Sequence, residues 1–362
     1  MAEHKTENLA PSALYDDWLY GYAQDTSYVA EYAMGGVTPR PLELARQAQE
    51  IHYAPSTNQS DETIPYVRVG DAAGNRPVLY VPGFTAGIMA KLPVAVGMAK
   101  RKGVEVILPG QNRKEILKDG LSGKEDATYS QAVNMLDVLG DAGLGNRTVD
   151  VMTHSYGSLI FEKMVQIADR RGLRCFQDSH VVMTAPAGLN NRENPFALGL
   201  RFAKGFRSEG PMHKDILKDG FDALGDEMFR AGQANVRANV PRALREAWEL
   251  ARRRLDIAAL RRSGIGSLAI LSFAQDDLFP ARIAERTMAQ AFADQPGIEN
   301  LAPIVWATPV SLQGKPGEPI RGGRDAGHND DQFNPARVAG AVYQLMHPLK
   351  TRYRIGFADP NN

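Results

Sequence analysis

The sequence has 362 residues, 43% of them hydrophobic, and its 42 basic side chains balance 42 acidic ones, so the net charge is zero. This length allows one large core with an insertion, or two domains, while the neutral balance argues against nucleic acid as the main partner. Cys175 is the single cysteine, which excludes an intrachain disulfide, and the Cys and His spacing suggests no metal or cofactor site. Because the sequence shows no basic and apolar leader and no long apolar run, we expect a cytoplasmic protein without a membrane span.

Residues 1–60 do not follow a regular pattern of strands and helices, and we expect them to form an N-terminal arm. Aromatic side chains are dense among acidic ones between Tyr15 and Tyr32. Aromatic residues at this density seldom stay in water, so the arm is predicted to lie on the body of the protein or to join two copies into a homo-oligomer. The alternative is that it lines the entrance to a binding site.

Strand and helix patterns alternate from residue 64 onward. Strand patterns occupy residues 66–69, 77–81, 104–108, 149–152, 181–184, 268–273 and 304–306. Helical patterns occupy residues 88–101 and 127–139, the segment after Ser155, the segment from Ala281, and residues 335–345. This alternation predicts an α/β fold with a mostly parallel central sheet flanked by helices.

The segment 188–266 contains no strand pattern and is predicted to be a helical cap inserted over the strand ends. Its last helix is expected over residues 242–262, with Leu244, Trp248 and Leu255 on one side. The arginines of that helix form either a clamp for an anionic ligand or a solvated face, and the acidic residues among them favour the solvated face. The predicted division is an arm (1–60), a core (61–187), a cap (188–266) and the second part of the core (267–362).

The stretch around Ser155 carries the strongest chemical signal. Val149, Val151 and Met152 form a strand pattern, which gives way to a tight turn at Ser155 and then to a helical pattern. The run Thr153-His154-Ser155-Tyr156-Gly157 is one residue short of G-x-S-x-G, a motif that holds a serine on a strained strand-to-helix turn. A serine held in this way can meet a base on one side, while backbone N–H groups stabilise a developing oxyanion on the other.

Two later segments supply the groups that would activate such a serine. Asp276 and Asp277 directly follow a buried strand, and His328 lies in a glycine-rich loop before the last helix. Because ligands bind at the carboxyl edge of an open parallel sheet, we expect these segments to meet there. His328 would take the proton from Ser155, and Asp276 would orient the imidazole. Asp277 is the rival for the acid, and the spacing from Asp276 to Pro280 favours Asp276.

An oxyanion site needs two donors. The backbone N–H of Tyr156 follows the serine, and the turn Pro82-Gly83-Phe84 after an early strand would offer the N–H of Phe84. Glycine at position 83 allows the backbone to approach a bound molecule closely.

These motifs resemble those of the α/β-hydrolases, over roughly residues 66–349. The resemblance implies that Ser155 is the nucleophile, Asp276 the acid, His328 the base, and Phe84 and Tyr156 the oxyanion donors. The sequence departs from the family pattern at two places: Thr153 replaces the first glycine of the elbow, and Pro82-Gly83 stands where many members have His-Gly. Residues 1–60 are not covered by the resemblance.

The resemblance implies a serine hydrolase that cleaves a carboxylic ester or related small acyl compound through an acyl-enzyme. Acyl transfer and cleavage of amides or peptides remain alternatives, because the same three groups serve them. A binding module that has lost turnover is a further alternative, and the complete set of three groups argues against it. Nucleotide binding is disfavoured, because no G-x-x-x-x-G-K-[ST] motif occurs.

Overall fold

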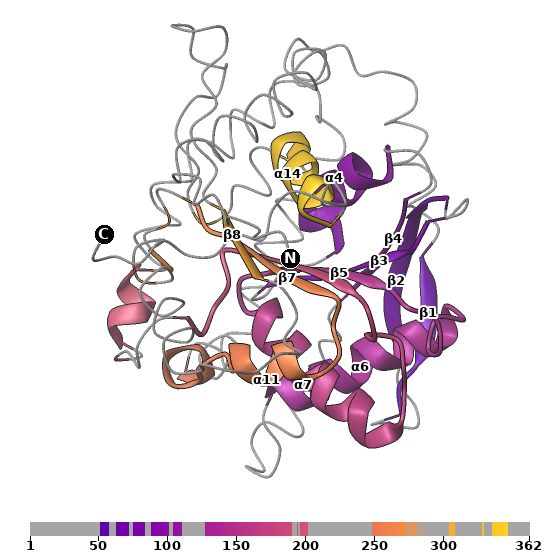
Figure 1. The fold of residues 1–362 in the computed structure, drawn as a ribbon, viewed down its shortest axis with the longest axis horizontal. Coiled ribbons are helices and arrows are strands. Elements are labelled where there is room, and N and C mark those ends of the chain that lie inside the picture. The colour runs from indigo at the N-terminus through magenta and orange to yellow at the C-terminus, as the bar shows by residue number, and fades with distance from the viewer. Residues whose placement is uncertain are drawn as a thin grey trace, which may run out of the picture.

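A central eight-stranded sheet organises the molecule, with strand order β1-β2-β4-β3-β5-β6-β7-β8 (Figure 1). The computed structural model describes residues 51–57, 63–71, 75–83, 88–100, 104–110, 127–189, 194, 196–201, 248–273, 276, 278–280, 283, 304–307, 328 and 335–346. The strands are β1 (His52–Pro55), β2 (Thr63–Gly70), β3 (Val78–Val81), β4 (Glu105–Pro109), β5 (Asp150–His154), β6 (His180–Thr184), β7 (Ser267–Leu271) and β8 (Ile304–Ala307).

The six strands from β3 onward run parallel, whereas β1 and β2 join the sheet antiparallel. This confirms the predicted mostly parallel sheet. Strand β1 was not predicted and falls inside the segment expected to be an arm. It is short and lacks β-branched residues, so its intrinsic strand propensity is low. The strand forms because it pairs with β2 and because His52 stacks on Tyr66, with ring centroids 5.1 Å apart.

Helices cover both faces of the sheet (Figure 1). Helices α4 (Ile88–Ala99) and α14 (Pro335–Met346) lie on one face, and α6 (Ala127–Asp141), α7 (Gly157–Arg171) and α11 (Ile257–Arg262) lie on the other. Consecutive strand residues therefore enter opposite cores: Val151 of β5 packs in the cluster beneath α6 and α7, and Met152 packs in the cluster beneath α4. Both clusters are apolar, which explains why these strands read as continuous hydrophobic runs.

The long helix predicted over residues 242–262 is wrong as a single element. Residues 253–256 are not helical, and a new helix, α11, begins after them. Asp256 causes this restart, because its side chain caps α11 by accepting a hydrogen bond from the Ala259 N–H at 2.8 Å. Leu255 is buried, whereas Trp248, which was expected on the same side of the helix, is 49% exposed and its ring centroid lies 4.0 Å from the Arg252 guanidinium. Leu244 and most of the helix predicted from Ala281 lie outside the described residues.

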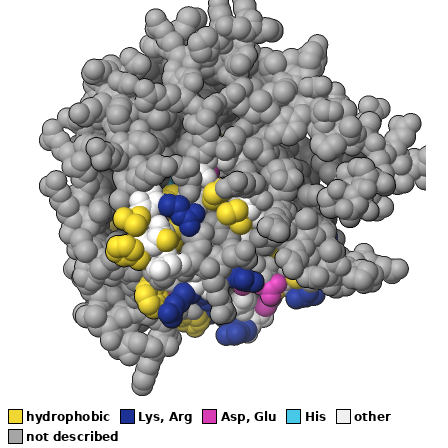
Figure 2. Space-filling model, turned by 90° about the vertical axis from the view of Figure 1, so that its left-hand side faces the viewer, with side chains coloured by type: hydrophobic (Ala, Val, Ile, Leu, Met, Phe, Trp, Pro, Cys, Tyr) yellow, Lys and Arg dark blue, Asp and Glu magenta, His cyan; other side chains and the backbone are white. Residues whose placement is uncertain are grey.

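The first residue of the predicted cap segment, Gly188, contacts a late residue of the same segment, Leu255. The Leu255 N–H donates to the Gly188 carbonyl at 3.0 Å, so the chain leaves the sheet after β6 and returns to nearly the same point. On the face shown in Figure 2, the described residues carry basic side chains beside hydrophobic ones, with an acidic side chain among them. In the described ranges, no helix is long and apolar enough to cross a bilayer.

Replacing the N-cap residue of α11 tests the role of Asp256 in starting that helix. Asp256→Ala removes the acceptor for the Ala259 N–H and is expected to lower the free energy of unfolding by about 1 kcal/mol in urea titrations. Asp256→Asn retains a capping oxygen and should lose far less. Equal stability of Asp256→Ala and the wild type would contradict the capping role.

Candidate active site

Ser155 lies on a strained turn between β5 and α7. Its φ angle is +53°, in the left-handed region that residues other than glycine rarely adopt. Two backbone hydrogen bonds hold this conformation. The Ser155 N–H donates to the Thr184 carbonyl, and the Ala187 N–H donates to the Ser155 carbonyl, both at 3.0 Å. The neighbouring strand β6 and the segment after it therefore hold the serine in place.

Glycine at position 157 is required by the close approach of β3. A Cβ atom there would lie 2.3 Å from the Val81 carbonyl oxygen and 2.8 Å from that of Pro82. A Cβ at Gly83 would likewise lie 3.0 Å from the Cβ of Ser155. The turn after β3 and the turn at the serine are thus packed against each other, with glycine on both sides of the contact.

Thr153 shows how the chain accommodates a residue in place of the first glycine. Its hydroxyl is fully buried and lies 2.8 Å from the Ser158 hydroxyl in the first turn of α7. The extra side chain is therefore used within the turn, where it links the end of β5 to the start of the helix.

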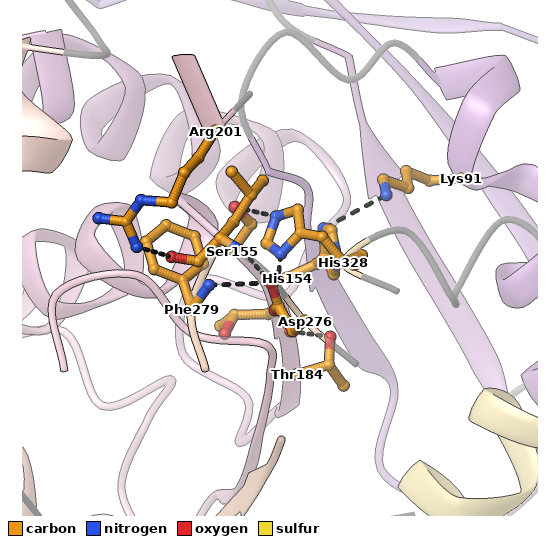
Figure 3. A network of polar contacts seen from close by, with 10 residues as sticks. Lys91, His154, Ser155, Thr184, Arg201, Asp276, Phe279 and His328 are labelled. Atoms are coloured by element: carbon orange, nitrogen blue, oxygen red, sulfur yellow. Dashed lines mark hydrogen bonds and ion pairs between the residues drawn. The ribbon is translucent and has the colours of Figure 1, made fainter. Parts of the chain in front are cut away.

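The structure brings Ser155, His328 and Asp276 into one hydrogen-bonded row (Figure 3). His328 Nε2 lies 2.9 Å from Ser155 Oγ, and His328 Nδ1 lies 2.8 Å from Asp276 Oδ2. All three residues are buried, although His328 lies 173 positions after Ser155 in the sequence. With a neutral imidazole, Nδ1–H donates to the carboxylate and Nε2 accepts from the serine hydroxyl, which is the arrangement a general base needs.

The carboxylate of Asp276 is itself held in position. Its Oδ1 atom accepts the backbone N–H groups of Leu278 and Phe279, both at 2.8 Å, which leaves Oδ2 for His328. The Phe279 ring meets the His328 ring edge-on, with centroids 5.1 Å apart. The short loop after β7 therefore supplies both the acid and a wall for the imidazole.

The predicted oxyanion donors are only partly described. Tyr156 directly follows the serine at the start of α7, where backbone N–H groups point out of the helix. Phe84 lies outside the described residues, although Pro82 and Gly83 before it lie beside the serine turn. Asp277, the rival acid, also lies outside the described residues.

The Tyr156 side chain makes a contact that the sequence did not indicate. Its side chain is buried, and its hydroxyl donates to Glu249 Oε2 at 2.8 Å. Glu249 belongs to the segment predicted to form the cap, so this bond ties that segment to the residue after the serine. The two residues are 93 positions apart, and no sequence pattern connects them.

Cys175, the single cysteine of the sequence, is buried. Burial raises the pKa of the Cys175 thiol to about 11, so it is a poor source of thiolate near neutral pH. Among the described residues, no group of three or more His, Cys, Asp or Glu side chains is arranged to hold a metal ion.

Comparison with known proteins gives structural likeness only. No protein-family model matches the sequence, and no curated protein matches it. Among solved structures, an esterase from Thermogutta terrifontis is similar at 17% identity with a TM-score of 0.51, over 83% of this chain and 100% of that one. The esterase RhEst1 from Rhodococcus sp. ECU1013 is similar at 16% identity with a TM-score of 0.53, over 83% and 99%. A meta-cleavage product hydrolase from Pseudomonas fluorescens IP01 has 11% identity and a TM-score of 0.52, over 82% and 97%.

The glycine contact at the serine turn can be tested by stability. Gly157→Ala forces a methyl group against the carbonyl oxygens of β3, so the free energy of unfolding should fall by roughly 1–3 kcal/mol. Gly140→Ala is the matched control, because a Cβ at that helical glycine meets nothing within 4 Å. Chemical denaturation should show the control unchanged or stabilised by up to about 1 kcal/mol. A Gly157→Ala variant as stable as the control would contradict the close packing.

Proposed function

We propose that this chain, which has the α/β-hydrolase fold, is a serine hydrolase that cleaves a carboxylic ester or a related small acyl compound through an acyl-enzyme. The observation that carries the proposal is the hydrogen-bonded row from Ser155 through His328 to Asp276. This row lies at the carboxyl edge of the parallel sheet, where proteins with this kind of fold bind their ligands.

In the first half of the proposed reaction, Ser155 Oγ attacks the ester carbonyl carbon while its proton passes to His328 Nε2. The carbonyl oxygen takes up the negative charge, and the backbone N–H groups of Tyr156 and Phe84 would stabilise it. The tetrahedral intermediate then expels the alcohol, which takes the proton from His328. An acyl group remains on Ser155.

In the second half, a water molecule gives its proton to His328 and its oxygen attacks the acyl carbon. Collapse of the second tetrahedral intermediate releases the carboxylic acid and returns the proton to Ser155. Asp276 stays ionised throughout, because its part is to hold the Nδ1–H tautomer and to stabilise the imidazolium.

The likeness to esterases of known structure favours ester substrates, although it extends to the fold alone. Acyl transfer and amide cleavage would use the same row of residues, and competition between water and added alcohols or amines in the second half of the reaction separates them. We further propose that residues 188–266 form the cap that selects the substrate. The hydrogen bond from the Tyr156 hydroxyl to Glu249 supports this, because it joins the segment to the residue after the serine. The hydrogen bond from the Leu255 N–H to the Gly188 carbonyl joins two distant parts of the segment to each other.

Removing the nucleophile or the base tests the proposal. Ser155→Ala and His328→Ala should each lower kcat on p-nitrophenyl esters by about 10⁴-fold or more, because these residues act as one unit. Thermal unfolding should change little. A fluorophosphonate probe should label the wild type and leave Ser155→Ala unlabelled. A folded wild type that is neither labelled nor active, yet binds small acyl ligands, would instead indicate a binding module.

The acid is tested by comparing two neighbouring aspartates. Asp276→Asn replaces a carboxylate oxygen that accepts from His328 Nδ1, which disturbs the tautomer and should lower kcat by about 10³-fold or more. Asp277→Asn is the matched control and should retain most activity. The reverse order of the two losses, measured as kcat at a saturating ester concentration, would assign the acid to position 277.

A further inference from the structure

A second histidine lies behind His328. The side chain of His154, the residue before the serine, is only 2% exposed, and its Nε2 lies 3.0 Å from the backbone carbonyl oxygen of His328. The two imidazole rings have centroids 5.1 Å apart (Figure 3). His154 therefore contacts the main chain of the predicted base, while the side chain of that base contacts Ser155 and Asp276.

The other nitrogen of His154 faces a buried lysine. Lys91 Nζ lies 3.3 Å from His154 Nδ1, and Lys91 is only 1% exposed on helix α4. The His328 carbonyl oxygen can only accept, so His154 Nε2 is the donor to it, and the bare Nδ1 of the neutral imidazole accepts from Lys91 Nζ. The proton of the neutral imidazole then lies on Nε2, which donates to the His328 carbonyl. Lys91 thus stabilises the tautomer of His154 that donates to the His328 carbonyl.

The ring of His154 sits in a site with little spare room. A Cβ atom at Gly83 would come within 3.0 Å of His154 Nδ1 and within 3.0 Å of its backbone oxygen. His154 is the last residue of β5, and its backbone pairs with that of Thr184 in β6. Because the His154 side chain is held in place on β5, its hydrogen bond can fix the position of the His328 backbone relative to the sheet.

We infer that His154, oriented by Lys91, is a positioning residue that sets the distance between the imidazole of His328 and the hydroxyl of Ser155. The inference rests on the proposed function only for its kinetic consequence. A displacement of a reacting group by about 1 Å can cost roughly 100-fold in rate. His154 does not contact a substrate in this role, so its loss should act on kcat and leave KM nearly unchanged.

The kinetic test compares three variants. His154→Leu removes both hydrogen bonds and should lower kcat by about 10- to 100-fold. His154→Gln places an amide nitrogen near the position of Nε2 and should recover most of that loss. His180→Leu is the control, because it removes a partly buried histidine bonded to Ser267 at the far end of β6. The number of active molecules, counted with a fluorophosphonate, separates kcat from any loss of folded protein.

Histidine NMR supplies a readout that does not need turnover. Long-range ¹H–¹⁵N spectra should show the His154 proton on Nε2, with the signal assigned by its loss in His154→Gln. The ring signals of His328, assigned with His328→Ala, should shift in His154→Leu and stay in place in His180→Leu. Lys91→Met should change the His154 signals in the same spectra.

The outcomes separate the two proposals. A His154 proton on Nδ1, His328 signals unmoved in His154→Leu, or a kcat of His154→Leu within twofold of the wild type would each overturn the positioning role. A loss in His154→Leu that His154→Gln does not recover would also overturn it, because it would indicate packing alone. A wild type that neither labels nor turns over esters would refute the proposed hydrolase, and the NMR shifts would then decide the positioning role.

Discussion

The packing of the turn after β3 against the turn at Ser155 is the constraint on which the site depends. Gly157 passes so close to the Val81 carbonyl that no side chain fits between them. This contact lets the chain reverse from strand to helix within two residues and leaves Ser155 at a positive φ angle. Such a conformation costs of order 1–3 kcal/mol and persists only because bonds to β6 and packing on β3 determine it together.

The parallel sheet then gathers the other groups at the same edge. Strand β5 ends at His154 just before the serine, and β7 ends at Leu271 a few residues before Asp276. Both strands are anchored in two apolar cores, so their ends are fixed relative to each other by packing on both faces. Two backbone N–H groups then orient the carboxylate, and the carboxylate orients the imidazole.

The sequence predicted most of the sheet because the parallel strands β3 to β7 are short apolar runs that are buried on both faces. Ser155, Asp276 and His328 were predicted to meet because each follows a recognisable strand or glycine-rich segment. Local patterns could not reveal β1, which exists through pairing, or the break before Asp256. They also could not reveal the bonds of Tyr156 to Glu249 and of Lys91 to His154, which join residues 93 and 63 positions apart. Such pairs depend on which helix packs beside which strand end, and no motif marks Glu249 or Lys91 as the partner of a residue beside Ser155.

These long-range bonds make β5 a common reference for the groups around the serine. The strand carries Ser155 directly, contacts the main chain of His328 through His154, and continues into Tyr156, whose hydroxyl bonds Glu249. If only the His328 side chain made hydrogen bonds, a shift of the His328 backbone could displace the imidazole ring from Ser155. Because the His328 carbonyl is also bonded to the residue before the serine, a shift of β5 would move the hydroxyl and the imidazole together, so that their separation would change less than their position.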